Sequence, residues 1–149
     1  MSVITPYLFV PAIRERNLDK ALGISLSGEA KIIFDFEDSV GDLDDLILSG
    51  ELKAKARNIL MEFFKRNQIK FLIRTNDVAS KFWEDDKDFL IELSKILPMT
   101  SLCQGIVMSK TNTSEEILTF LDWWKEKHAF SLPILPLIET VEGFKNLQE

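Results

Sequence analysis

The sequence predicts an α/β fold built on a parallel sheet, and three observations support this prediction. Short apolar runs alternate with longer amphipathic segments along all 149 residues, which is the pattern of repeated βα units. Polar or charged residues close several of the apolar runs, and no linker or low-complexity segment separates them. We therefore expect one domain over residues 1–149, with about five parallel strands and alternating helices.

The first two βα units occupy the N-terminal part of the chain. Residues 7–10 are expected to form a strand that Pro11 ends, and residues 14–22 the helix after it. The second strand is expected over residues 31–38. Apolar residues in 51–66 recur at spacings of three and four, so this segment is predicted to be a helix. The acidic stretch before it is predicted to be a loop.

The remaining units follow the same order. Residues 70–76 are predicted to be the third strand, and the helix over residues 83–97 is expected to end before a proline. The fourth strand is expected over residues 105–110 and the fifth over residues 134–140, with a helix from Val141 onward.

The helix between the last two strands has a recognisable beginning. Thr113 stands three residues before Glu116, which is the spacing of a capping box, where each side chain accepts a hydrogen bond from the other residue's backbone N–H. We expect this helix to extend to about residue 127.

Composition and charge exclude several classes of protein. The net charge of −6, without a basic cluster, argues against a nucleic-acid partner. No apolar run reaches about 18 residues, so no membrane span is expected. The N-terminus lacks the basic and apolar regions of a signal peptide, and the single Cys103 excludes an intramolecular disulfide. A cytoplasmic protein is therefore expected.

The period of a strand predicts which side chains share a face. Alternate residues point to opposite sides of a sheet. Phenylalanines 34 and 36 belong against covering helices, so Asp35 and Glu37 are expected on the opposite, inner face. The same reasoning gives further inner-face sets in the next three strands: Leu72, Arg74 and Asn76; Ile106, Met108 and Lys110; Leu135, Leu137 and Glu139.

Charged residues therefore gather where the strands end. Glu37, Arg74, Lys110 and Glu139 would meet at the C-terminal edge of the sheet, where active sites of parallel α/β proteins lie. Four unpaired buried charges would cost too much free energy. They must pair with each other, with a metal or with a ligand, and their convergence favours a site over isolated structural ion pairs.

Six segments in order resemble the N-terminal portion of the HpcH/HpaI aldolase and citrate lyase β-subunit family. Each motif is short, but together they cover nearly the whole chain. The matching positions are 8–12 with Arg14, the run FDFEDSV at 34–40, Lys53 with Ala56 and Arg57, 73–76, Lys110 with 114–116, and PLIET at 136–140 with Gly143.

The resemblance implies a magnesium-dependent carbon–carbon lyase on a TIM barrel. Such enzymes act on oxoacid-yielding substrates, often acyl-CoA thioesters of the citryl-CoA or malyl-CoA type. It implies a partial (β/α) barrel here, truncated before strands 6–8. It also implies that Glu139 ligates Mg²⁺ and that Glu37 and Asp38 lie near the metal. Arg74 would hold the substrate carboxylate, with Arg14 and Lys110 as further substrate-binding residues.

The chain also departs from the family pattern. Ser109 stands where the family has proline, and the family's second metal ligand, an aspartate, would fall beyond Glu149. Three alternatives follow: a fragment of a full-length lyase, a chain completed by a further chain or by a copy of itself, or a non-catalytic partial barrel that binds or assembles. Homo-oligomerisation or completion by a further chain is expected.

Overall fold

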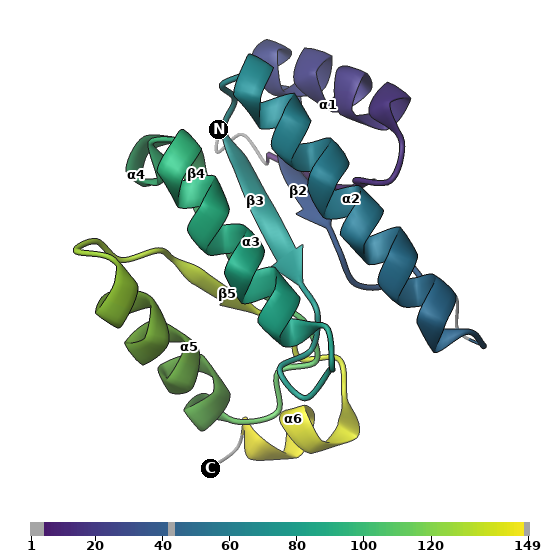
Figure 1. Ribbon diagram of the computed structural model, residues 1–149. Helices are drawn as coiled ribbons and strands as arrows, with labels where there is room; N and C mark the ends of the chain where they lie inside the picture. Colours follow the sequence, from purple (N-terminus) through teal and green to yellow (C-terminus); the bar gives the residue numbers. More distant parts are fainter. Residues whose placement is uncertain (1–4, 42–43, 148–149) are drawn as a thin grey trace.

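The computed structural model describes residues 5–41 and 44–147. A five-stranded, all-parallel sheet alternates with helices (Figure 1), which confirms the predicted α/β class. The strands lie in the sheet in chain order. The elements are β1 (Tyr7–Pro11), α1 (Glu15–Ser27), β2 (Lys31–Asp35), α2 (Leu46–Arg66), β3 (Phe71–Thr75), α3 (Trp83–Ile96), α4 (Met99–Leu102), β4 (Cys103–Met108), α5 (Ser114–Lys127), β5 (Ile134–Pro136) and α6 (Val141–Asn146).

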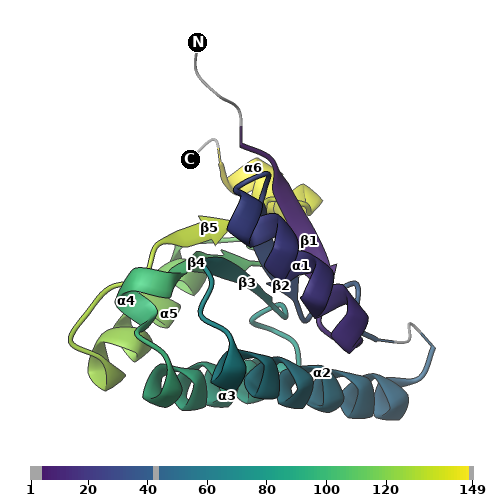
Figure 2. The same ribbon diagram turned by 90° about the horizontal axis from the view of Figure 1, so that it is seen from above.

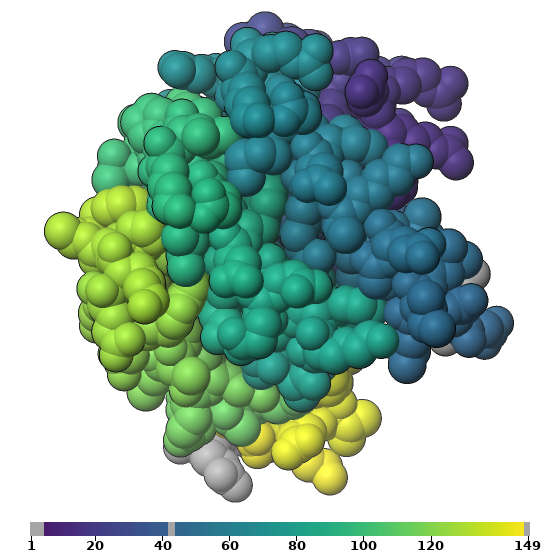
Figure 3. All heavy atoms as spheres, in the orientation of Figure 1, coloured from purple at the N-terminus to yellow at the C-terminus, as the bar shows by residue number. Residues whose placement is uncertain are grey.

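The main helices pack on one face of the sheet. Leu18 of α1, Leu60 of α2, Leu90 of α3 and Trp124 of α5 all belong to one buried cluster. Figure 3 shows α2, α3 and α5 side by side over this face, and Figure 2 shows β1 and α1 turning away from the central strands. The opposite face carries a small apolar cluster drawn from strands and the segment after β5: Ile33, Leu72 and Val107, with Leu135 and Leu137 packed against them.

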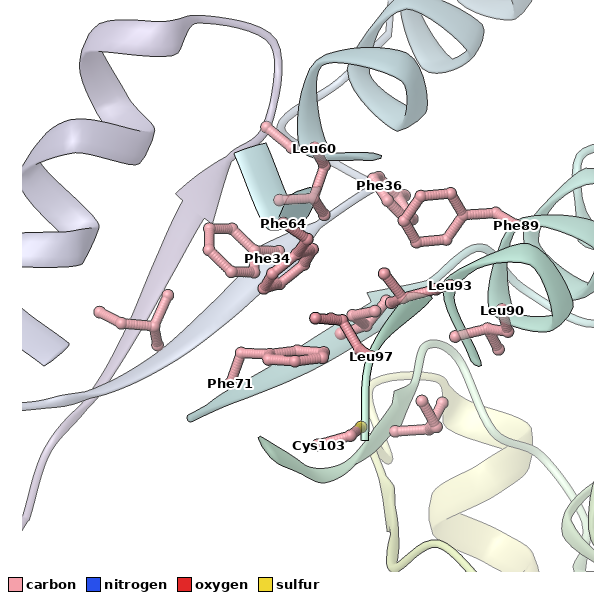
Figure 4. Packing of buried hydrophobic residues seen from close by; sticks show 14 of the residues in the cluster. Phe34, Phe36, Leu60, Phe64, Phe71, Phe89, Leu90, Leu93, Leu97 and Cys103 are labelled. Carbon is pink, nitrogen blue, oxygen red and sulfur yellow. The ribbon is translucent and has the colours of Figure 1, made fainter. Parts of the chain in front are cut away.

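Aromatic rings fill the space between the sheet and the helices (Figure 4). Phe34 meets Phe64 edge-on, with ring centroids 5.5 Å apart, and Phe64 lies 4.4 Å from Phe71. Phe36 meets Phe89 of α3 at 5.0 Å and 88°. Such pairs contribute about 0.5–1.5 kcal/mol each beyond the burial of their area. The prediction that Phe34 and Phe36 face the helices is confirmed.

Helix ends follow their capping residues. The capping box of Thr113 and Glu116 is present at the start of α5, as predicted. Helix α2 begins at Leu46 and not near residue 51, because the Asp45 side chain accepts hydrogen bonds from Ile47 N and Leu48 N, both at 2.9 Å. Across the part of the chain that the structure describes, no helix is long and apolar enough to cross a membrane.

The prediction of inner-face residues in β4 was wrong. Arg74 is in register with Val107, so Val107 faces inward, while Ile106 and Met108 belong to the helix-covered cluster. Strand β4 stops at Met108, and Lys110 follows it in a left-handed turn. The direction of Lys110 therefore does not report which face Ile106 and Met108 share.

Four strands end earlier than predicted. Strand β2 stops at Asp35, β3 at Thr75, β4 at Met108 and β5 at Pro136. Glu37 and Glu139 therefore lie in connecting segments, and their directions are set by turns and not by strand alternation.

Candidate functional site

An ion pair between Asp35 and Arg74 forms the centre of the candidate site. The two residues are in register on adjacent strands β2 and β3. Arg74 Nε donates to Asp35 Oδ1 at 2.7 Å, and Arg74 Nη2 donates to Oδ2 at 2.5 Å. Both residues are buried, with 1% of Asp35 and 7% of Arg74 exposed. Two parallel bonds of this kind fix the orientation of the guanidinium group.

Asp35 also shapes the turn that follows β2. Its carboxylate accepts hydrogen bonds from Glu37 N at 2.9 Å and Ser39 N at 3.2 Å. Burial alone would raise the pKa of Asp35, but the hydrogen bonds from Arg74, Ser39 and Glu37 lower the pKa below its ordinary value. The ionised carboxylate thus holds both the strand end and the turn carrying Glu37 and Asp38.

Arg74 also contacts the two acidic residues of this turn. Its Nη1 lies 3.1 Å from Asp38 Oδ2 and 3.4 Å from Glu37 Oε2. The Phe9 ring of β1 lies 4.9 Å from the guanidinium carbon. Burial would lower the pKa of Arg74, but Asp35, Asp38 and Glu37 raise it. The predicted carboxylate-binding residue is therefore bound in this structure by the chain's own carboxylates.

Lys110 reaches the site from a turn beyond β4. Its backbone has a φ of 49°, in the left-handed region, and its Nζ lies 2.6 Å from Glu37 Oε1. Its pKa is raised, chiefly by the hydrogen bond to Glu37. Ser109 is buried and donates to Thr75 O at 2.8 Å, which anchors the turn at the position where the resemblance expected proline.

Glu37 retains unused hydrogen-bonding capacity. Its side chain is 7% exposed, and Oε2 has no hydrogen-bond partner among the described residues, although Arg74 Nη1 is near. Burial raises the pKa of Glu37, and Asp38 raises it further, against the opposing effect of Lys110. A buried carboxylate with one open oxygen can accept a proton or a ligand's hydrogen bond.

The other two predicted residues lie at the margin of this cluster. Glu139 is exposed, and its Oε1 accepts a hydrogen bond from Lys110 N at 3.0 Å. Arg14 is exposed at the N-cap of α1, and no ion pair joins it to the cluster within residues 5–41 and 44–147. Within the same ranges, no group of three or more His, Cys, Asp or Glu side chains could hold a metal ion.

A buried lysine behind the site was not predicted as a site residue. Lys53 of α2 donates to the carbonyl oxygens of Phe36 at 2.5 Å and Glu37 at 2.8 Å. Burial lowers the pKa of its ammonium group. Lys53 shares the buried face of α2 with Ala56 and Leu60, and this helical spacing was a signal that it points toward the sheet.

A second buried ion pair joins α2 to α3. Arg57 donates to Asp86 Oδ1 through Nη2 at 2.7 Å and Nε at 3.0 Å. Asn76 donates to Asp86 Oδ2 through its backbone N at 2.6 Å and its Nδ2 at 2.8 Å. Burial raises the pKa of Asp86 although Arg57 and Asn76 oppose it. Asn76, predicted on the inner face, instead turns toward α3 because it follows the end of β3.

Neither protein-family models nor curated proteins match this chain. The function is therefore inferred from the geometry of the site and from the sequence motifs.

Proposed function

We propose that the chain carries part of the active site of a magnesium-dependent carbon–carbon lyase of the citrate lyase β-subunit type. Its substrates would be small oxoacid-yielding molecules, such as citryl-CoA-like or malyl-CoA-like thioesters. One observation carries the proposal: Arg74 and Lys110 both contact Glu37 at the C-terminal edge of a parallel sheet. Active sites of such sheets lie at this edge.

The sheet order supports a partial (β/α) barrel. Strands in chain order, joined by right-handed crossovers, place every covering helix on the same face. Doubly wound sheets instead reverse their order and carry helices on both faces. The order β1-β2-β3-β4-β5 and the single helix-covered face therefore favour the first five units of a barrel. A further chain segment or a second chain would complete it.

The proposed reaction cleaves a 3-hydroxyacyl substrate next to its hydroxyl-bearing carbon. The hydroxyl proton passes to Glu37 Oε2, the carbon–oxygen bond becomes a carbonyl, and the electron pair of the broken C–C bond remains on the α-carbon as an enolate. Arg74 and Lys110 bind the substrate carboxylate through charge-assisted hydrogen bonds. Asp38, which is exposed, would give up its contact with Arg74, while Asp35 keeps its two bonds.

Glu139 is the candidate magnesium ligand, and Mg²⁺ can bind one or two carboxylates together with waters. The described residues supply no group of three or more His, Cys, Asp or Glu side chains that could hold a metal ion, so by themselves they do not form a metal centre. When bound, Mg²⁺ would stabilise negative charge on the enolate oxygen.

The test is oxoacid release from malyl-CoA or citryl-CoA with Mg²⁺ present, followed with a coupled dehydrogenase. Arg74→Met should lower kcat/KM by about 100-fold or more, and Glu37→Gln should lower kcat. The control is Lys55→Met, which changes an exposed lysine of α2. If the folded chain releases no oxoacid from any of the thioesters tested, this chain is not an active lyase.

A non-catalytic binding or assembly protein is the second candidate. Two observations favour it: the guanidinium of Arg74 is already bound by Asp35 and Asp38, and β1 and β5 each pair on one side only within the described chain. Thermal unfolding with and without Mg²⁺ separates the candidates, because a ligand that binds the folded state raises its stability. Stabilisation that Glu139→Gln abolishes would support the lyase.

A further inference from the structure

A cavity lies beside Glu37 and Lys110. Its volume is about 320 Å³, and it opens between the loops after β2 and β3 and the first turns of α2. Neither Arg74 nor Glu139 lines it. Pockets of about this size bind small molecules in other proteins. The position is the C-terminal edge of the sheet, where ligands of open α/β folds also bind.

Buried polar side chains form the back of this cavity. Ser49, Lys53 and Asn76 line it, and each is at most 5% exposed. The Lys53 ammonium borders the open space, since a Cβ added to Gly41 would lie 3.8 Å from its Nζ and 3.3 Å from Ser49 Oγ. The wall therefore contains an ammonium group, a hydroxyl and an amide.

The charges around the cavity disfavour an ionic ligand. Glu37, Asp38 and Asp77 line it together with Lys53 and Lys110, so the lining has three acids against two bases. The excess of acids repels an anion, and a buried ammonium on the back wall repels a cation. A neutral hydroxyl group avoids both costs, because it donates to carboxylates and accepts from ammonium groups.

The lining also has an apolar part. Leu46 and Phe82 line the cavity, and their surfaces suit the C–H faces of a saturated ring. We propose that the cavity binds a neutral polyhydroxylated ligand, either a free sugar or the ribose of a nucleoside. The cavity shares Glu37, Asp38 and Lys110 with the proposed lyase site but not Arg74, and the observations that support a neutral ligand do not depend on the lyase reaction.

The test is saturation-transfer NMR of the whole chain with D-glucose, D-ribose and adenosine as probes. Sodium D-gluconate, in which C1 of glucose is oxidised to a carboxylate, tests the charge preference. The blocking variant is Gly41→Leu, whose side chain would fill the cavity without removing a charged group. The matched control is Gly23→Ala in α1, where an added Cβ meets nothing within 4 Å.

The expected result is saturable binding of at least one neutral probe, at least about tenfold weaker in Gly41→Leu and unchanged in Gly23→Ala. Binding of ribose and adenosine without glucose would identify a nucleoside, and binding of glucose would identify a sugar. No saturable binding by the native chain, or equal affinity in a folded Gly41→Leu, would overturn the proposal. So would gluconate binding that Gly41→Leu weakens as strongly as glucose binding.

Phe82→Ala is the second variant, for use if Gly41→Leu does not fold. It should also weaken binding of the neutral probes. Arg74→Met separates the two proposals, because it removes a residue of the lyase site that does not line this cavity. This variant should keep sugar binding and lose lyase activity. Sugar binding by a native chain that has no lyase activity would reject only the lyase.

Discussion

Asp35 organises more of the candidate site than any residue predicted to act in it. One carboxylate binds Arg74 through two bonds and accepts two backbone N–H groups of the turn after β2. Four hydrogen bonds to one buried side chain give the turn a defined shape. The positions of Glu37 and Asp38 therefore depend on a residue whose own role is structural.

Asp35→Asn should destabilise the fold by about 3–5 kcal/mol, because it leaves the buried Arg74 charge without its main partner. Urea unfolding of both proteins measures this difference. Asp38→Asn is the control: its side chain is 59% exposed and also contacts Arg74, and exposed pairs contribute about 0–1 kcal/mol. Equal losses in the two variants would contradict the assignment of Asp35 as the centre of the network.

Glu37 should make stability depend on pH in the opposite sense to Asp35. Burial raises its folded-state pKa above the value in the unfolded chain. Its contribution to stability is then greatest below the unfolded pKa and is lost as the pH rises through the folded pKa. Asp35, with a lowered pKa, contributes above its unfolded pKa and loses that contribution as the pH falls through the folded pKa.

Glu37→Gln removes this titration, so the stability of the variant relative to the native chain should increase between about pH 4 and pH 7. Each unit of pKa difference corresponds to about 1.4 kcal/mol. Urea unfolding at several pH values measures the trend. A relative stability that stays constant or decreases over this range would show that burial does not govern the Glu37 carboxyl.

At the scale of elements, the sequence predicted the interiors of helices and strands well and the residues where they end poorly. Apolar spacing identified the five strands and the main helices, and the capping box located the start of α5. Strand alternation also placed Phe34 and Phe36 correctly against the helices. These features depend on residues a few positions apart, which a sequence displays directly.

The errors came from single residues that change the local backbone. Strand β4 ends at Met108, so a charged residue two positions later does not report which residues of the strand face inward. Lys110 does reach the site, but through a left-handed turn and not through the strand direction that was expected. The position of Glu139 depends on the segment after β5, whose path follows no regular period.

Gly105 is the residue that permits the close packing of β4 on β5. Its φ is 153°, and an added Cβ would lie 2.8 Å from Leu135 Cδ1 and 2.9 Å from Pro133 O. Gly105→Ala should therefore destabilise the protein by about 1–3 kcal/mol. Gly23→Ala in the helix α1 should instead stabilise it by about 0.5–1 kcal/mol. Thermal unfolding measures the change in Tm of both variants. Changes of the same sign in the two variants would contradict the role assigned to Gly105.

At the scale of the whole molecule, the two edge strands of the sheet differ in how well they are protected against pairing with another chain. Strand β1 exposes Tyr7, Leu8 and Phe9, each between 37% and 47%. Strand β5 is only three residues long and contains Pro136, which has no N–H to offer a neighbouring strand. Strand β1 also ends in a proline, Pro11, but its five residues present a longer apolar edge, and longer apolar edges favour pairing with another chain. The β1 edge is therefore the favoured place for association.

A charge on β1 should weaken this association. If the β1 edge binds a second chain, the native protein should self-associate at increasing concentration, and Leu8→Lys should shift it toward the monomer because a buried ammonium at the edge is costly. Sedimentation velocity over a range of concentrations measures the populations. The control is Leu26→Lys, which changes a leucine of α1 that is 72% exposed and does not belong to a sheet edge. If the native protein remains monomeric at every concentration, or if both variants have equal effects, the β1 edge is not the site of association. The partial-barrel proposal would then require completion by a further segment.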